Sequence, residues 1–242
     1  MTIDLDRRTF LKSGTLLAAG AALAAATAPA AAQTAGPTPS APKPITFDVK
    51  PMPFDPTKIK GLSEKILTSH YANNYTSAVK RLNQITEQLA GLDYAKAPGY
   101  LINGLKREEL TATNSMILHE VYFAGLGPEE SQPGSALPDA VARDFGSFEW
   151  WRAQFAAMGR AEGGGSGWVL LTWDPRNKRL FNAWAADHTT TLAGGPPILA
   201  LDMYEHAYQI DYGAKAGDYV DAFMRAIRWA NADSLYAQHA HG

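Results

Sequence analysis

Apolar residues recur at helical spacing over the first regularly patterned part of the chain. Between Leu62 and Ala90 this spacing is met by Ile66, Val79, Leu82, Ile85 and Leu89. No Pro or Gly interrupts the run before Gly91, so it predicts one long helix. A loop through Pro98-Gly99 leads to a second predicted helix, from about Lys106 to Ala124. Two helices joined by a loop are expected to pack as an antiparallel hairpin.

A Gly/Pro/Ser-rich joint between Gly127 and Leu137 separates this helical half from the rest of the chain. Helix is expected from Asp139 to Arg160, with a bulky aromatic face formed by Phe145, Phe148, Trp151 and Phe155. Helix is expected again from about Tyr219 to Gln238.

Between these helices the pattern is that of β-structure. Two β-rich runs, residues 168–173 and 180–185, flank turn-forming residues at 174–177 and predict a hairpin. A third apolar run, residues 198–201, ends at Asp202. The expected fold class is therefore α+β: an N-terminal antiparallel helical hairpin followed by a mixed domain with a three-stranded antiparallel sheet and flanking helices.

The composition is that of an ordinary globular protein, since 46% of the 242 residues are hydrophobic and 19% are charged. The formal net charge of −2 gives no electrostatic reason to expect nucleic acid or anionic lipid as a partner. Cysteine is absent, which excludes disulfides, thiolate metal sites and cysteine nucleophiles. Any metal site must therefore use nitrogen and oxygen ligands.

The N-terminal residues have the pattern of a cleavable signal peptide. Arg7-Arg8 precede an apolar, Ala-rich run, and the small residues Ala30-Ala31-Ala32 follow it. The paired arginines resemble a twin-arginine export signal, although Asp6 stands where Ser or Thr is usual. Cleavage near Ala32 would give a periplasmic or secreted protein. The alternative is an uncleaved membrane anchor, for which the apolar run is shorter than the ~20 residues that a span needs.

Four segments are expected along the chain. Residues 1–32 are the signal peptide, 33–56 a linker and N-terminal arm, 57–127 the helical hairpin and 138–242 the C-terminal α/β domain. No second apolar run of spanning length follows the signal peptide, so no membrane contact is expected after cleavage.

Histidines and one carboxylate are the candidates for chemistry. Asp202 and His206 are four residues apart, so they share one face if the segment is helical. A buried carboxylate needs a partner, but a simple Asp–His hydrogen bond would serve as well as a metal. His70 and His119 lie in the predicted helices, where each could instead be a core histidine with its hydrogen bonds satisfied. His188 follows the second predicted strand, where it could instead be an exposed histidine at a strand end. The remaining two of the six, His239 and His241, belong to a C-terminal tail.

Several stretches together resemble the iron/manganese superoxide dismutase family. Residues 201–208, Leu-Asp-Met-Tyr-Glu-His-Ala-Tyr, are similar to that family's metal-binding segment. His119 with the trailing Tyr122-Phe123 is similar to its second-helix histidine, and His70 to its first-helix histidine. Further stretches agree in order and rough spacing: Arg143-Asp144-Phe145-Gly146-Ser147, Gly165-Ser166-Gly167-Trp168 and Asp218-Tyr219-Val220. The resemblance covers roughly residues 49–237.

The resemblance implies that His70, His119, Asp202 and His206 bind one iron or manganese ion per subunit, with a solvent molecule completing the site. Nitrogen and oxygen ligands suit either redox-active metal and do not decide between them. The implied activity converts superoxide to dioxygen and hydrogen peroxide by redox cycling of the metal, with proton uptake on the metal-bound solvent. Coupling the electron to a proton keeps the charge of a buried site constant.

The resemblance also implies roles for residues around the metal. His188 stands where the family has a Gln or His that contacts the bound solvent. Glu205 is similar to a glutamate that reaches across a homodimer interface to the other subunit's terminal histidine ligand. Tyr204, with Trp168 and Phe123, would wall the metal with aromatic surface.

Departures from the family pattern occur at the substrate channel and at the subunit interface, and the family more often has Trp at the positions of Tyr204 and Phe123. Ala78 stands where a tyrosine usually guards the substrate channel, and Tyr71 and Tyr75 are the tyrosines considered as replacements. Asn74 and Gln209 stand where the family usually has a His–Tyr contact between subunits, so we expect an amide–amide hydrogen bond to sustain the dimer there. The intact ligand set favours the enzyme. The departures favour the alternative, a metal-binding protein of the same fold with weak or no dismutase activity.

Overall fold

The computed structural model describes residues 42–128, 131–134 and 136–240. The predicted signal peptide, the first part of the predicted linker and His241 lie outside the described residues. In chain order the elements are η1 (Pro56–Lys58), α1 (Glu64–His70), η2 (Tyr71–Tyr75), α2 (Thr76–Ala90), α3 (Gly99–Ala124), α4 (Ala136–Phe145), α5 (Phe148–Glu162), β1 (Trp168–Asp174), β2 (Arg179–Ala185), β3 (Pro197–Asp202), η3 (Glu205–Ala207), α6 (Gln209–Tyr212), α7 (Ala216–Ala226) and α8 (Trp229–Ala240). The predicted α+β class is confirmed, whereas the boundaries of the four predicted segments stay predictions. Within the described residues, no helix is both long and apolar enough to cross a membrane.

The predicted first long helix is helical from Glu64 to Ala90. It begins after Ser63, two residues later than Leu62, because the Ser63 hydroxyl accepts a hydrogen bond from the main-chain nitrogen of Ile66 at 3.2 Å. The segment η2 is a π-helix, so the backbone widens directly after His70. Apolar spacing alone does not reveal this widened turn.

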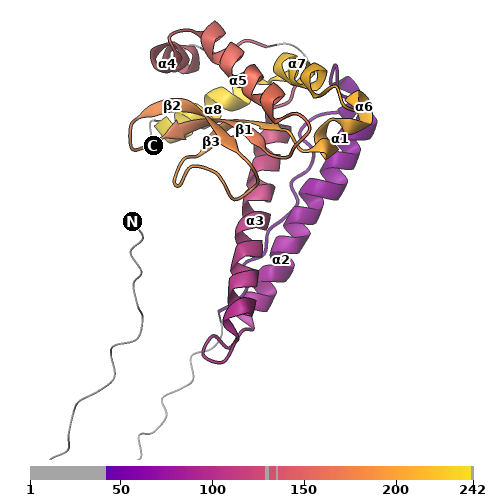
Figure 1. Cartoon of the computed structure of the whole chain (residues 1–242), viewed down its shortest axis with the longest axis vertical. Coiled ribbons are helices and arrows are strands. Elements are labelled where there is room, and N and C mark those ends of the chain that lie inside the picture. Colours follow the sequence, from indigo (N-terminus) through magenta and orange to yellow (C-terminus); the bar gives the residue numbers. More distant parts are fainter. Residues whose placement is uncertain (1–41, 129–130, 135, 241–242) are drawn as a thin grey trace, which may run out of the picture. The chain divides into compact units, whose positions relative to one another are not determined.

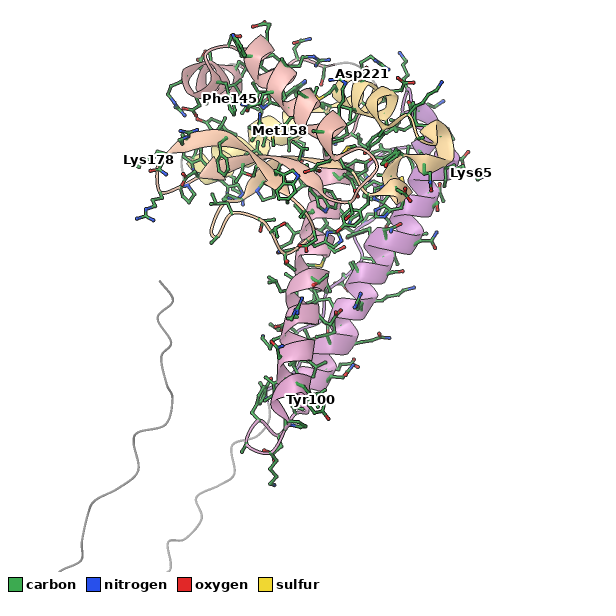
Figure 2. All side chains as sticks on the ribbon, viewed as in Figure 1. Lys65, Tyr100, Phe145, Met158, Lys178 and Asp221 are labelled. Carbon is green, nitrogen blue, oxygen red and sulfur yellow. The ribbon has the colours of Figure 1, made fainter. Side chains whose placement is uncertain are left out.

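The second helix of the hairpin, α3, begins at Gly99 rather than near Lys106. Pro98 is extended and precedes the first turn, where its missing N–H costs nothing. In its first two turns Tyr100 is 81% exposed and Leu101 37%, whereas Ile102 and Leu105 are half-buried, so apolar residues there do not mark a single buried face. Figure 1 shows α2 and α3 side by side as the predicted antiparallel hairpin, and Figure 2 labels Tyr100 at its free end.

The sheet has the strand order β2-β1-β3 with antiparallel pairing throughout. The predicted hairpin of β1 and β2 is confirmed, and Figure 2 labels Lys178 at its turn. Trp168 pairs with Ala185 on one side and with Asp202 on the other. The side chains of β1 are buried from Trp168 to Trp173, and in Figure 1 α5 lies above the sheet while α3 lies below it. The central strand therefore presents Trp168 to the end of α3 where His119 lies.

The predicted helix from Asp139 to Arg160 is two helices, α4 and α5. Gly146 has φ +88°, a conformation that ends α4 and that glycine adopts without strain. Ser147 then caps α5 by accepting a hydrogen bond from the main-chain nitrogen of Trp150 at 3.1 Å.

The predicted helix from Tyr219 to Gln238 is likewise two helices, α7 and α8. Ile227 is extended and pairs with Leu126 in an isolated antiparallel bridge. The main-chain nitrogen of Arg228 donates to the carbonyl oxygen of Gly125 at 2.7 Å. This pairing joins residues far apart in the sequence, so no local pattern could predict the break.

Candidate metal centre

Four side chains from separate elements converge between the hairpin and the sheet. His70 ends α1, His119 lies in α3, Asp202 ends β3 and His206 lies in η3. One ligand-type atom of each lies within 4.8 Å of all the others. Three of the side chains are at most 1% exposed, and that of His206 is 26% exposed. The structure thus brings together all four residues expected to bind the metal.

Oδ2 of Asp202 is the centre of this group. It lies 3.1 Å from Nε2 of His70, 3.1 Å from Nε2 of His206 and 3.7 Å from Nε2 of His119. Among the described residues, Nε2 of His70 and Nε2 of His119 have no hydrogen-bond partner, although both are buried. Buried polar atoms are almost always satisfied, and a cation bound here would satisfy both. Three imidazole nitrogens and one carboxylate oxygen fit iron or manganese.

The ring of His119 is oriented by the helix that carries it. Its Nδ1 lies 2.6 Å from the carbonyl oxygen of Ser115, one turn earlier in α3. A carbonyl oxygen only accepts, so Nδ1 carries the proton and donates it. In the neutral ring Nε2 is then unprotonated, and its lone pair is free to bind a cation.

Burial and charge set the protonation of the group. Burial lowers the pKa of His70, and it lowers the pKa of His119 to about 3. Burial alone would raise the pKa of Asp202, but the adjacent His206, a hydrogen bond from His206 and the nearby ring of His70 hold it well below its ordinary value. Two neutral imidazoles and an ionised carboxylate are therefore present at neutral pH, the forms that bind a cation without first losing a proton.

The main chain around Asp202 fixes its carboxylate. The main-chain nitrogen of Tyr204 donates to Oδ1 of Asp202 at 2.9 Å, which leaves Oδ2 for the histidines. The hydroxyl of Tyr219 donates to the carbonyl oxygen of Asp202 at 2.7 Å. Tyr204 is extended, and His206 lies in the short 3-10 helix η3. Asp202 and His206 therefore meet without the α-helical turn that their spacing suggested.

His188 lies in the loop after β2 and is held from three sides. The indole nitrogen of Trp168 donates to its Nδ1 at 2.9 Å, and the side-chain amide of Asn114 donates to its carbonyl oxygen at 2.5 Å. The ring of Tyr204 stacks on it with centroids 4.9 Å apart. An indole N–H only donates, so neutral His188 carries its proton on Nε2. Burial lowers the pKa of His188, which favours this neutral form.

The three predicted wall residues each lie against a different histidine. The ring of Phe123 is 5.1 Å from that of His70, and Trp168 is 5.2 Å from His119. Tyr204 stacks on His206 at 5.3 Å. Aromatic surface therefore covers the group on several sides and excludes water from them.

One hollow joins this group to the surface. Its volume is about 200 Å³, and its lining includes His119, His188, His206, Asn74 and Ala78. His206, the most exposed of the four, thus faces the open side of the group.

Comparison with known proteins adds an independent observation. Residues 133–235 match the family described as iron/manganese superoxide dismutases, C-terminal domain. The chain is 63% identical over 193 residues to the superoxide dismutase (Fe) of Cupriavidus metallidurans, which covers 80% of this chain and 98% of that relative. It is 35% identical over 202 residues to the superoxide dismutase (Mn) 1 of Halobacterium salinarum, with 80% and 96% covered. The chain belongs to the iron/manganese superoxide dismutase family.

Within this superoxide dismutase the expected interface residues line two different hollows. Glu205 and Gln209 are exposed, and both line a second hollow of about 310 Å³. Asn74 is half-buried and lines the first hollow instead. Their roles at a subunit interface stay predictions.

The tyrosines considered as replacements at the substrate channel point elsewhere. Tyr71 donates from its hydroxyl to the carbonyl oxygen of Lys50 at 2.6 Å. The hydroxyl of Tyr75 accepts from the main-chain nitrogen of Lys50 at 2.9 Å and donates to Glu120 at 3.1 Å. Both hydroxyls therefore form hydrogen bonds with the main chain of Lys50 in the N-terminal arm.

Sequence reasoning missed several residues that support the site. Ser115 is four residues before His119, and that spacing on a helix was its only signal. Asn114 and Tyr219 act through long-range contacts that no local pattern reveals.

Glu162 is 8% exposed, and neither of its carboxylate oxygens has a partner among the described residues. Burial, with the nearby charge of Asp202, raises the pKa of Glu162 to about 8.

Proposed function

We propose that this protein is a superoxide dismutase that holds one iron or manganese ion per subunit on His70, His119, Asp202 and His206. The observation that carries the proposal is the convergence of three Nε2 atoms on Oδ2 of Asp202, two of them buried without a hydrogen-bond partner among the described residues. A bound metal supplies one-electron oxidation and reduction of superoxide, which yields dioxygen and hydrogen peroxide.

The protein's own residues orient the ligands, exclude water and hold a proton near the reaction. Ser115 orients His119, and the main chain of Tyr204 orients Asp202. His188 lines the hollow and holds a proton on Nε2, because Trp168 occupies its Nδ1. We assign to His188 the contact with the solvent molecule expected at the metal, where this proton would be donated to it.

Superoxide would enter through the hollow lined by Asn74 and Ala78. Ala78 is buried and offers no hydroxyl, so proton delivery rests on His188 and on water in the hollow. The side chain of Tyr204, stacked between His188 and His206, would keep both rings in place.

A homodimer completes the proposal. Glu205 would reach the terminal histidine ligand of the second subunit, and Asn74 and Gln209 would meet across the interface through their amides. Exposure of Glu205 and Gln209 supports this assignment, because an isolated subunit leaves both side chains free to contact a second copy. Sedimentation of Asn74→Ala tests it: a dimer as tight as that of the parent would count against the amide contact.

We also propose that the protein is exported after synthesis. The support is the sequence pattern of residues 1–32, with the paired Arg7-Arg8 and the small residues ending at Ala32. Intact mass of the protein in the periplasmic or secreted fraction should correspond to a chain that starts near Gln33. Retention of the full-length chain in Arg7→Lys/Arg8→Lys would support the twin-arginine route.

The decisive experiment is the dismutation rate per bound metal, for the parent and for His206→Ala. A parent rate approaching about 10⁸–10⁹ M⁻¹s⁻¹ that is lost in the variant supports the enzyme. Stoichiometric metal with a negligible rate would favour the second candidate, a metal-binding protein of the same fold. The observation that favours this second candidate is Ala78, which leaves the hollow without a tyrosine hydroxyl.

A further inference from the structure

The N-terminal arm, residues 45–54, lies along the helical hairpin and is held at two separate places. In Figure 1 it is the indigo coil that runs between α3 and the pair α1–α2. At the first place Asn83 exchanges two hydrogen bonds with the main chain of Phe47, at 2.8 and 2.9 Å. There the hydroxyl of Thr86 also donates to the carbonyl oxygen of Ile45 at 2.9 Å. These contacts lie on α2, beyond the part of the hairpin that carries the ligand-type histidines.

The second place is a group that we call the arm clasp: Lys50, Tyr71, Tyr75 and Glu120. The main-chain nitrogen of Lys50 donates to the Tyr75 hydroxyl at 2.9 Å, and the Tyr71 hydroxyl donates to the Lys50 carbonyl oxygen at 2.6 Å. The Tyr75 hydroxyl donates in turn to Oε1 of Glu120 at 3.1 Å. Nζ of Lys50 forms an ion pair with Oε2 of the same Glu120. One arm residue thus ties the π-helical segment η2 to α3.

The arm clasp is adjacent to two of the histidines of the metal centre. Tyr71 directly follows His70, and Glu120 directly follows His119. Between them lies Phe123, whose ring is 5.6 Å from Tyr71, 5.1 Å from His70 and 6.5 Å from His119. Any shift of η2 relative to α3 would therefore move the rings of His70 and His119 relative to each other.

We propose that the arm clasp is a positioning device for the metal: Lys50 holds the widened turn after His70 against α3, so that Nε2 of His70 and Nε2 of His119 converge on one ion. A π-helical turn departs from the usual helical geometry, and here side-chain contacts fix it. Burial raises the pKa of Tyr75 to about 12, so its hydroxyl keeps the proton that it donates to Glu120. Partners beyond the ligands commonly set metal affinity, because they fix the orientation of the ligand rings.

The test compares two double variants, each of which removes hydrogen bonds that hold the arm at one of its two places. Tyr71→Phe/Tyr75→Phe opens the arm clasp and keeps both rings. Asn83→Leu/Thr86→Val releases the arm at its first place and leaves the arm clasp intact. Each protein is loaded with iron or manganese, and release of the metal to an excess of chelator is followed. The thermal midpoint of each metal-free protein is measured alongside.

We expect the arm-clasp variant to release its metal roughly tenfold faster than the parent, the lower range for loss of residues that position metal ligands. The control variant should release metal at the parental rate, even if both metal-free variants lose a similar number of degrees in midpoint. Equal release from the arm-clasp variant and the parent would overturn the proposal, and so would equal acceleration in both variants, which would indicate a general loosening of the arm.

If the arm-clasp variant fails to fold, Lys50→Met serves in its place, because it removes only the ion pair to Glu120 and the lysine is 69% exposed. Faster metal release from Lys50→Met supports the arm clasp, and an unchanged rate contradicts it. The inference rests on the proposed function, since it takes His70 and His119 as ligands. A parent protein that binds neither metal would refute that function. A parent that binds metal, with an arm-clasp variant that releases it at the same rate, would refute the inference alone.

Discussion

The indole nitrogen of Trp168 lies 2.9 Å from Nδ1 of His188 and donates a hydrogen bond to it. Trp168 is fully buried at the start of β1, between Ala185 and Asp202 in the sheet. The sheet register that places Asp202 in the metal centre therefore also places the residue that sets the tautomer of His188. Two parts of the site depend on one position of the central strand.

The first prediction concerns this hydrogen bond. Trp168→Phe removes the N–H, and His188 can then carry its proton on either nitrogen. We expect kcat/KM for superoxide to fall roughly tenfold at unchanged metal content, the lower range for loss of a partner around a metal site. Trp173→Phe is the matched control, because Trp173 is also buried in β1 but packs on Tyr236. Equal losses in the two variants would mean that the effect is one of packing.

The second prediction concerns the charge at the centre of the ligand group. Asp202→Asn keeps an acceptor oxygen for the main-chain nitrogen of Tyr204 but removes the negative charge that faces the histidines. Bound iron or manganese, measured by elemental analysis, should fall from one per chain to near zero. The circular dichroism spectrum should stay that of the parent. Full metal occupancy in this variant would contradict the assignment of Asp202 as a ligand.

The third prediction concerns the buried carboxyl of Glu162. Its pKa is about 8 in the folded protein against an ordinary value of 4.5. At pH values below 4.5 both the folded and the unfolded chain hold this proton, so Glu162 does not lower the free energy of unfolding there. As the pH rises toward 8 only the unfolded chain ionises, and the free energy of unfolding falls until the folded form ionises too.

Glu162→Gln cannot ionise, so its free energy of unfolding relative to the parent should rise between about pH 4.5 and pH 8 and then level off. Urea unfolding at intervals of pH measures this difference. Glu149→Gln is the control, because hydrogen bonds to its own main chain and to Ser147 lower the pKa of Glu149. A flat difference for Glu162→Gln across this range would mean that its carboxyl is satisfied in solution.

The fourth prediction compares two helical glycines. A Cβ on Gly159 in α5 would lie 2.7 Å from Leu201 and 3.0 Å from Val220, so Gly159→Ala should overpack the core and lower the free energy of unfolding by about 1–3 kcal/mol. A Cβ on Gly104 in α3 would meet nothing within 4 Å. Gly104→Ala should therefore raise the free energy of unfolding by about 0.5–1 kcal/mol, because alanine has the higher helix propensity. Thermal or urea unfolding of the pair would show effects of opposite sign, and a shared sign would contradict this reading of the packing.

Local signals were enough to locate the strands and the helical regions, but not the breaks between helices. The turn between β1 and β2 is determined by Asp174, whose carboxylate accepts hydrogen bonds from the main-chain nitrogens of Arg176 and Asn177. Those residues lie next to one another in the sequence, so the pattern could reveal them. The break at Ile227 depends instead on its pairing with Leu126, and only the folded chain brings the two together.

For the metal centre, too, local sequence signals revealed only a part. Spacing alone drew attention to Asp202 and His206, but it could not join them to His70 and His119, which lie on other elements. The resemblance to superoxide dismutases made that connection, and the geometry agrees with it. Glu162 escaped both routes, because a carboxylate near the end of an amphipathic helix looks like an exposed residue until the fold covers it.

The distribution of the four side chains over α1, α3, β3 and η3 has a consequence for protein synthesis. A nascent chain that has emerged only through α3 offers two imidazoles and no carboxylate from this group. Asp202 and His206 follow only after the strands of the sheet have left the ribosome, and Tyr219, which holds the main chain of Asp202, emerges later still. A complete binding site is therefore absent until translation is nearly finished. The compartment in which the finished chain folds then determines which metal ions it encounters first.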